Sequence, residues 1–570
     1  MKGDFSRDSF DARKRYTRVL MQQGRVQLDA DWNEQADTVL HLLRTLAADI
    51  FGAHGGPATD LGFRVVEKPH PSRAAEIVDL LIGPGHYYVA GILCENDRDP
   101  DPRPGDGVTY YEQPYFPLST QQLKDRFKIP DPAVAPFIVY LDVWERLVTS
   151  IEDPSLREVA LGGPDTATRT QVVWQVRLLP LGSSTQLAEV TCENVQNTQA
   201  WQEGLVIPAR RRGRLRAKAQ EPRPADIGDP CNVSPDARFR GRENRLYRVE
   251  IHEGGDAATA TFKWSGDNGS AAYPVVNVGG RTVTLAHLGR DARSGLRTGD
   301  WVELVDDHYE LLQEALPLHQ VEEVDAVGMR VILKTAPDAA VGRDASLHPL
   351  LRRWDHREGD PRTGGLRLRD GAAVVVEQEG DAAGWLALED GIQIKFEPGA
   401  TYRRRDYWLI EARTATGDIN WPRAAHDQPA ALPPHGVEHH YAPLANIYNA
   451  AASLTAPASI ALFDLRHSLA PAACRDDSGC PVVLITGGDL DSNGVHHFHS
   501  DIRGNFNPPS PPGPAFQWTV TNGTIQGAAN GASVQVAPAA GNDPIIVKLR
   551  VDNFPTHCRN MATFVVQRGD

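Results

Sequence analysis

The sequence predicts a mainly β, multi-domain protein with an N-terminal helix, β-sandwich or barrel-like domains, and a C-terminal immunoglobulin-like sandwich. The chain has 570 residues, too many for one compact core, and suits about three to five domains. Its 50 glycines and 42 prolines separate short runs rich in β-branched and aromatic residues, a pattern typical of strands joined by turns. Only one stretch has strong helical periodicity.

The charge and cysteine content exclude several classes of protein. With 59 basic and 74 acidic residues the formal net charge is −15, so the chain has no global attraction to nucleic acid or anionic lipid. Six cysteines are too few for a disulfide scaffold. The polar start and the lack of an apolar run near 20 residues predict synthesis in the cytoplasm without a signal peptide, and no membrane span.

Residues 1–55 are expected to form an arm followed by a helix. Apolar residues recur at three- and four-residue spacing from about Ala30 to Phe51, and Gly52 ends the run. Trp32, Leu40 and Leu43 are the expected anchors of a docking face, although an apolar stripe of this kind also serves to pack a helix on its own protein.

The rest of the chain divides by its strand patterns. We predict a β domain over 56–206, a basic linker over 207–229, a small barrel over 230–340, a β domain over 341–468 that completes the first one, and an immunoglobulin-like domain over 469–570. The linker prediction rests on the run of basic residues from Arg210 to Lys218, and the barrel size suits either an SH3-like or an OB-like fold. In the last domain Trp518 is the expected inward tryptophan.

One short motif resembles a zinc site. His435, Glu438 and His439 match H-x-x-E-H, which in zinc peptidases lies on a helix that places both imidazoles on one face. Pro433, Pro434 and Gly436 disfavour a helix here, so the alternative is a loop whose imidazoles bond to the protein itself.

A second motif resembles half of a calcium loop. Asp489, Asp491 and Asn493, followed by Gly494, match the first positions of an EF-hand, but Ser500 stands where the loop needs a glutamate. The sequence leaves open a solitary Ca²⁺ loop or a plain turn stabilised by aspartate. No other cofactor is expected.

Two further groups of residues are candidates in the same region. His496, His497 and His499 can form a histidine cluster or a polar loop. A disulfide between two of the last three cysteines is plausible if the protein works outside the cell; these are Cys474, Cys480 and Cys558.

The segment from Met1 to Gln35 is the most distinctive part of the sequence. It resembles an uncharacterised bacterial family whose members occur with contractile injection systems, the phage-tail-like particles. Three later segments resemble the same family: Tyr247–His252 with Phe262–Ser265, Asp406–Ile410, and His439–Leu444. More weakly, the first segment is similar to the N-terminal attachment segments of some phage baseplate and fibre proteins. The segment Trp518–Gly523 resembles PKD-type immunoglobulin-like domains.

The resemblance implies a component of a particle that can be extracellular. Because no motif in the sequence makes a convincing active site, we expect a non-catalytic structural or adaptor component, associated with a baseplate, spike or fibre and oligomeric in the assembly. We expect residues 1–51 to bind other particle proteins and the C-terminal domain to contact a cell-surface target. Deletion of residues 1–51 is then expected to prevent incorporation while the remainder stays folded. The alternatives are a metal-dependent hydrolase carried by the particle and a glycan-binding module.

Overall fold

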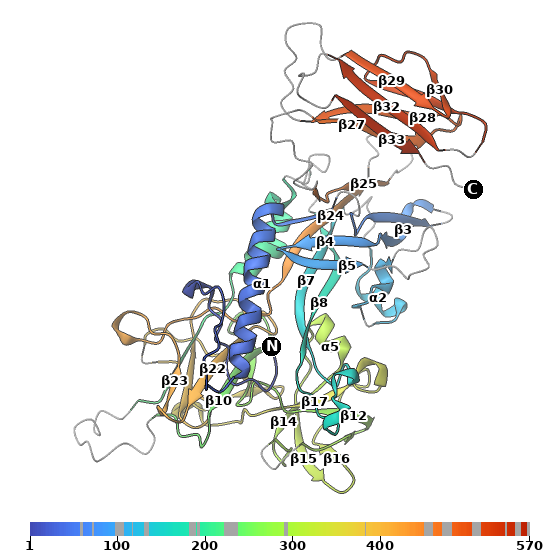
Figure 1. Ribbon diagram of the computed structural model, residues 1–570. Helices are drawn as coiled ribbons and strands as arrows, with labels where there is room; N and C mark the ends of the chain where they lie inside the picture. The colour runs from blue at the N-terminus through green and yellow to red at the C-terminus, as the bar shows by residue number, and fades with distance from the viewer. Residues whose placement is uncertain are drawn as a thin grey trace. The chain divides into compact units, whose positions relative to one another are not determined.

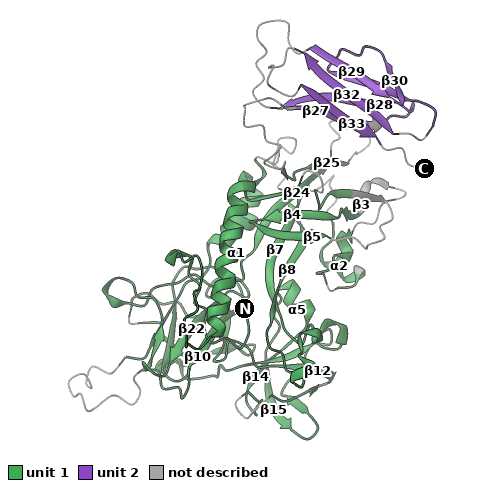
Figure 2. Cartoon of the chain, in the orientation of Figure 1, with its two compact units in different colours: residues 1–469 green, residues 470–570 purple. Residues whose placement is uncertain are grey.

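The chain folds into two compact units, residues 1–469 and 470–570 (Figures 1 and 2). The structure is a computed structural model. It describes residues 1–57, 61–70, 73–96, 108–116, 118–129, 136–181, 190, 194–221, 238–289, 294–381, 383–449, 460–469, 482–503, 515–541, 544–552 and 560–566. Strands make up 43% of the structure and helices 16%, so the protein is mainly β, as the sequence predicts. No helix in these ranges is long and apolar enough to cross a membrane.

The first core of unit 1 lies among three sheets. The sheets have the strand orders β25-β24-β7-β8, β26-β1-β4-β5 and β2-β3-β6. Their bounds are β1 (His54–Pro57), β2 (Val65–His70), β3 (Arg73–Ile82), β4 (Gly85–Val89), β5 (Ile92–Asn96), β6 (Val108–Thr109), β7 (Phe137–Val148), β8 (Arg169–Pro180), β24 (His440–Asn449), β25 (Ile460–Asp464) and β26 (Ser468–Leu469). Because β24 pairs with β7, the chain returns after residue 440 to the sheet begun near residue 137.

The second core joins a six-stranded sheet, β18-β19-β11-β10-β22-β23, to a three-stranded sheet, β20-β21-β9. The strands are β9 (Leu215–Ala219), β10 (Arg245–Glu253), β11 (Thr261–Ser265), β18 (Leu368–Arg369), β19 (Ala372–Val374), β20 (Leu386–Ala387), β21 (Ile392–Phe396), β22 (Tyr407–Arg413) and β23 (Asp418–Asn420). β10 is central and pairs with both β11 and β22.

The described part of residues 207–229 is not a linker. It contains α4 (Ile207–Arg210) and β9, whose Leu215 and Ala217 are fully buried. Its cations have partners in the same unit: Arg212 pairs with Asp406, and Arg216 with Glu397 at 2.6 Å. The basic residues therefore attach a core strand to its neighbours. The linker prediction used charge alone and missed that apolar residues alternate with the basic ones in this strand.

A closed barrel forms the third part of unit 1, with strand order β12-β13-β16-β15-β14-β17. Its strands are β12 (Ala272–Gly279), β13 (Thr282–Leu285), β14 (Trp301–Val305), β15 (His319–Asp325), β16 (Arg330–Leu333) and β17 (Leu350–Trp354). The barrel thus begins and ends later than the 230–340 expected, because β10 and β11 pair within the six-stranded sheet instead.

Unit 2 consists of two sheets around one apolar core. The sheets have the orders β27-β28-β31-β30 and β29-β32-β33. The strands are β27 (Val482–Leu490), β28 (His496–Arg503), β29 (Ala515–Thr521), β30 (Gly523–Gln526), β31 (Ser533–Pro538), β32 (Ile545–Asp552) and β33 (Met561–Val566). Trp518 is buried in this core.

Helices are few among the described residues. The longest is α1 (Asp29–Phe51), which begins one residue earlier than expected and ends where predicted. The others are α2 (Thr120–Arg126), α3 (Gln199–Trp201) with a π turn (Gln202–Val206) leading into α4, and α5 (Asp307–Leu312). Figure 1 shows α1 running along unit 1 as a single long rod.

A buried cluster of charged side chains joins separate parts of unit 1. We call it the charge cluster: Lys2, Arg248, Glu250, Lys263, Glu303, Glu310 and Arg405. These residues come from the N-terminal segment, β10, β11, β14, α5 and the loop before β22. The cluster therefore connects the N-terminus and the barrel to the six-stranded sheet.

Glu250 and Glu303 are the buried carboxylates of the cluster. Glu250 accepts from Arg248 at 2.6 Å and lies 3.3 Å from Lys2, and Glu303 lies 2.6 Å from Lys263. Burial alone would raise the pKa of Glu303, but Lys263 and the other nearby cations lower it to about 2. The same balance holds the pKa of Glu250 well below its ordinary value. Both groups are therefore ionised in the folded protein at neutral pH.

Replacing Lys263 tests this cluster. In Lys263→Met, Glu303 loses its ion pair and stays buried, so we expect the free energy of unfolding of unit 1 to fall by about 3–5 kcal/mol. The matched control is Lys334→Met, because Lys334 is an exposed barrel lysine that contacts Gln320. That change should cost less than about 0.5 kcal/mol. Equal stability of the two variants in chemical denaturation would contradict the role given to the cluster.

The lowered pKa of Glu303 also predicts an acid dependence. A carboxylate whose folded pKa is depressed contributes stability above its ordinary pKa of 4.5 and loses it as the pH falls toward 2. We expect the free energy of unfolding, measured from pH 5 to pH 2, to fall steeply in the wild type and less steeply in Lys263→Met. Parallel curves for the two proteins would contradict this assignment.

Candidate functional site

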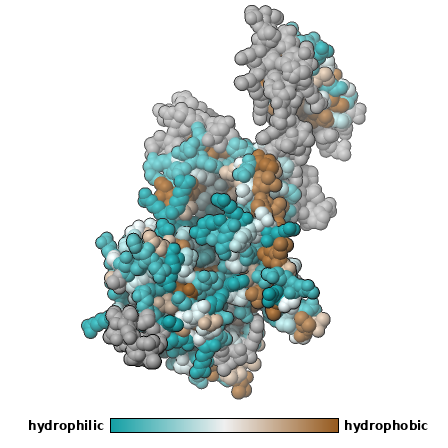
Figure 3. All heavy atoms as spheres, turned by 60° about the vertical axis from the view of Figure 1, so that its left-hand side comes forward, coloured by the Kyte–Doolittle hydropathy of each residue, from teal (hydrophilic) through white to brown (hydrophobic). Residues whose placement is uncertain are grey.

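The side of α1 that points away from the rest of unit 1 is apolar. Its residues recur at helical spacing and are exposed; we call them the outward face: Trp32, Ala36, Val39, Leu40, Leu42, Leu43, Leu46 and Ile50. Trp32 is 69% exposed and Leu43 57% exposed. Figure 3 shows apolar residues gathered in a long band at the height that α1 occupies in Figure 1. The expected anchors Trp32, Leu40 and Leu43 therefore do not pack on their own chain.

The opposite side of α1 faces unit 1 and is largely polar. Ala30 and Thr38 are buried there, and Glu34, Asp37 and Arg44 are half-buried. Arg44 makes two bonds to Glu145 of β7, at 2.7 and 3.0 Å. Burial, together with the charges of Asp8 and Glu145, raises the pKa of Asp37 to about 6. An amphipathic helix ordinarily buries its apolar side, so α1 is turned the other way.

The first ten residues attach α1 to unit 1. The Met1 amino group donates to the Tyr407 hydroxyl at 2.6 Å, and Asn268 donates to the carbonyls of Met1 and Gly3. Ser9 donates to Glu34 of α1 at 2.6 Å. This part of the expected arm is therefore fixed by polar contacts.

The next part of the arm, residues 15–28, is extended and exposed. It carries apolar side chains in contact with solvent: Tyr16, Leu20, Met21, Val26 and Leu28. It is linked to α1 by bonds from the backbone of Val19 to Gln35 at 2.8 Å and from the backbone of Leu28 to Asp31 at 3.3 Å. The arm thus extends the apolar surface of the outward face.

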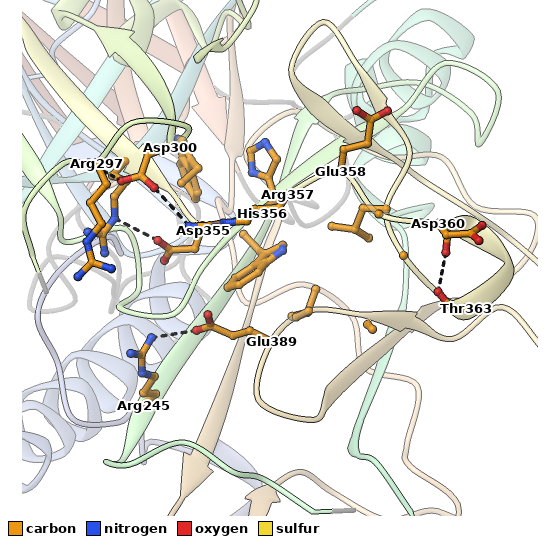
Figure 4. A pocket seen from close by; sticks show the side chains of 18 residues that line it. Arg245, Arg297, Asp300, Asp355, His356, Arg357, Glu358, Asp360, Thr363 and Glu389 are labelled. Atoms are coloured by element: carbon orange, nitrogen blue, oxygen red, sulfur yellow. Dashed lines mark hydrogen bonds and ion pairs between the residues drawn. The ribbon is translucent and has the colours of Figure 1, made fainter. Parts of the chain in front are cut away.

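A pocket of about 500 Å³ lies in unit 1 (Figure 4). It is lined by the end of β17 and the loop after it, the start of β10, β11, the loop before β14 and residues 387–389. This volume falls in the range of small-molecule sites, but the lining is charged where such sites are mostly apolar. Figure 4 shows Arg245 and Glu389 facing each other, and they are 2.9 Å apart.

Glu389 is the titrating group of this pocket. Burial raises its pKa to about 7, Arg245 opposes the shift, and the charge of Asp355 adds to it. A carboxyl that holds a proton near neutral pH can act as a general acid. Its neighbours are engaged by the protein itself, since Asp355 accepts from Gly266 at 2.8 Å and from Arg353 at 3.1 Å. The Trp264 indole nitrogen has no hydrogen-bond partner among the described residues. The pocket thus offers a titrating carboxyl and the unpartnered Trp264 indole nitrogen to a small polar ligand.

The H-x-x-E-H motif is not helical. His435 stacks on Tyr407 and accepts from the backbone of Leu409, whereas His439 stacks on Trp144 and bonds to Asp142 at 2.6 Å. The two histidines of the motif therefore have separate partners, and Glu438 takes part in neither set of these contacts. Within the described ranges no group of three His, Cys, Asp or Glu side chains could hold a metal ion.

The motif at 489–494 forms the turn between β27 and β28. Asp491 accepts from the backbone of Asn493 and of Val495, both at 2.9 Å, and from His497 at 3.0 Å. These bonds are those of an aspartate-stabilised turn, and they occupy the carboxylate that the calcium hypothesis needs. The side chain of Asp489 lies outside the described residues.

The histidines after this turn diverge. His496 is buried and bonds to the Gly488 carbonyl at 2.7 Å, while His499 is exposed. The predicted disulfide among Cys474, Cys480 and Cys558 falls outside the described residues.

The comparison with known families places the chain. Residues 1–204 and 182–455 match the model of a family of unknown function, DUF6519. The chain belongs to this family. No curated protein matches it. In this DUF6519 protein α1, the charge cluster and the pocket lie within the matched residues, and unit 2 lies beyond them.

Sequence reasoning found α1 and its stripe but missed the charge cluster and the pocket. Their members lie far apart in the chain and carry no spacing pattern. The available signal was that Arg248, Glu250 and Lys263 stand beside apolar and aromatic residues in short strands, which marks charges that need partners if the strands are buried.

Replacing His439 distinguishes a structural imidazole from a zinc ligand. His439→Ala removes a partner of the buried Asp142, so we expect the free energy of unfolding to fall by about 1–3 kcal/mol. His499→Ala, an exposed histidine, should have little effect. Metal content is measured by mass spectrometry in both variants and in His435→Ala. Stoichiometric zinc in the wild type that is lost in both His435→Ala and His439→Ala would overturn the structural role.

Proposed function

We propose that this protein is a non-catalytic structural or adaptor component of a phage-tail-like particle, and that it binds a neighbouring component through the outward face of α1 and the adjoining arm. The observation that carries the proposal is the orientation of α1. Its polar side bonds to its own chain, and its apolar side is left to solvent.

The energetic argument concerns exposed apolar area. The seven large residues of the outward face present roughly 500–700 Å², if a large apolar side chain offers about 150–200 Å². Exposed apolar patches of this size mark interaction sites. Leaving them in water costs free energy that only association recovers, so the outward face has the character of an interface.

The attribution to a phage-tail-like particle is supported by the place of the sequence resemblance. Its most specific segment, Met1–Gln35, covers the anchored N-terminus, the exposed arm and the start of α1. The segment thus contains the exposed apolar residues of the arm and Trp32, the first residue of the outward face. The hydrolase and glycan-binding alternatives have no comparable support in the described part of the chain.

Unit 2 suits a module that contacts another surface. We infer that it is an immunoglobulin-like sandwich. Counted along unit 2, one sheet contains the first, second, fifth and fourth strands and the other the third, sixth and seventh. This order matches constant-type immunoglobulin domains, in which a buried tryptophan lies on the third strand, as Trp518 does here.

Charged substitutions on the outward face test the docking role. In the double variant Leu43→Asp with Leu46→Asp, incorporation into particles should fall by at least tenfold, because two aspartates would be buried in the interface. The measurement is the amount of the protein that sediments with particles from a producing strain. The melting temperature should change little, because both side chains are already exposed.

The control is Thr45→Asp, on an exposed position of α1 outside the outward face. Normal incorporation of the double variant would contradict the proposal. Deletion of residues 1–51 is a poorer test than the sequence suggests, because it also removes Lys2 from the charge cluster and leaves Glu250 and Glu310 short of a partner.

A further inference from the structure

The outward face has the spacing of a coiled-coil seam. Its central residues alternate in steps of three and four: Trp32, Ala36, Val39, Leu43, Leu46 and Ile50. In heptad terms Ala36, Leu43 and Ile50 occupy a positions, and Trp32, Val39 and Leu46 occupy d positions. All six are exposed on one side of a helix about 35 Å long. A seam of this form fits another helix better than a flat sheet.

The seam is complementary to itself when two copies run antiparallel. In that arrangement each a residue packs against a d residue of the other helix. Centring the pair on position 41 places Trp32 against Ile50, Ala36 against Leu46 and Val39 against Leu43, so every seam residue meets a seam residue. The small Ala36 faces the large Leu46, so the facing pairs along the seam have similar total side-chain volumes. A parallel pair would instead stack Trp32 on Trp32 beside a layer of two alanines.

The positions that flank the seam also favour a second copy. They are Asn33, Gln35, Leu40, Leu42, Ala47 and Asp49, with a single charge among them. Specific pairing with a different helix generally uses opposite charges at these positions. In the antiparallel pair Leu40 meets Leu40, Leu42 meets Leu42, and Asp49 faces Gln35, so no like charges are brought together.

We propose that α1 of a second copy of this chain covers the outward face, giving a two-fold antiparallel helix pair. The proposal rests on the proposed function only in taking the outward face as an interface. The area that each copy contributes is comparable with the roughly 600–800 Å² per partner of stable interfaces. In a two-fold pair the same surface of both copies is buried, so a dimer leaves no part of the seam free for a third copy.

The mass of the full-length protein in solution is the first test. Light scattering at micromolar concentration should give twice the 62.4 kDa chain mass for the wild type and for Thr45→Asp. Leu43→Asp should give the mass of one chain, because it buries two symmetry-related aspartates against Val39. A single-chain mass for the wild type would overturn the proposal.

Cysteine cross-linking tests the orientation. The antiparallel pair places Ala36 opposite Leu46, so Ala36→Cys with Leu46→Cys should form a covalent dimer on mild oxidation, and Ala36→Cys alone should not, with the wild type as the background for native cysteines. Cross-linking of Ala36→Cys alone would show a parallel pair and overturn the stated geometry. If the wild type is a single chain while Leu43→Asp with Leu46→Asp still fails to enter particles, the partner is a different protein and the proposed function stands without self-association.

Discussion

The arrangement of unit 1 depends on the pairing of two buried carboxylates, Glu250 and Glu303, with three cations, Lys2 of the N-terminal segment, Arg248 of β10 and Lys263 of β11. Lys2 and Lys263 are separated by more than half of unit 1 in sequence, yet both lie within 3.5 Å of Glu250. An apolar contact tolerates sliding, whereas a buried ion requires its partner at one place and in one direction. The charge cluster therefore specifies how the barrel and the N-terminal segment meet the six-stranded sheet.

The unusual orientation of α1 follows from the same constraint. Because Met1 and Lys2 are held at the charge cluster, the chain must leave that point along the surface of unit 1, and α1 lies against it through Arg44 and the residues bonded to Ser9. The described bonds that hold α1 are polar, and its apolar side chains remain exposed.

Motifs that resemble metal sites are used here for structure. His439 orients a buried aspartate between two core strands, and Asp491 closes a hairpin turn. His435, His439 and Asp491, three of the side chains that a metal would require, are bonded to other groups of the protein. In the pocket, the ion pair between Arg245 and Glu389 links the six-stranded sheet to the loop between β20 and β21. Two ring nitrogens of its lining, Trp264 Nε1 and His356 Nδ1, have no hydrogen-bond partner among the described residues.

The sequence by itself determined the type and the approximate position of local elements such as α1, the strands of unit 2 and the turn at Asp491. The periodicity of α1, the alternation in the strands of unit 2 and the turn at Asp491 are set by neighbours within a few residues, so they could be predicted from spacing and turn chemistry. Tertiary structure alone decided which side of α1 is exposed and that β9 is a core strand and not a linker. It also decided that β10, which we expected in the barrel, pairs within the six-stranded sheet. These outcomes depend on contacts between residues hundreds of positions apart, such as Lys2 with Glu250 and Arg216 with Glu397, and no local pattern records them.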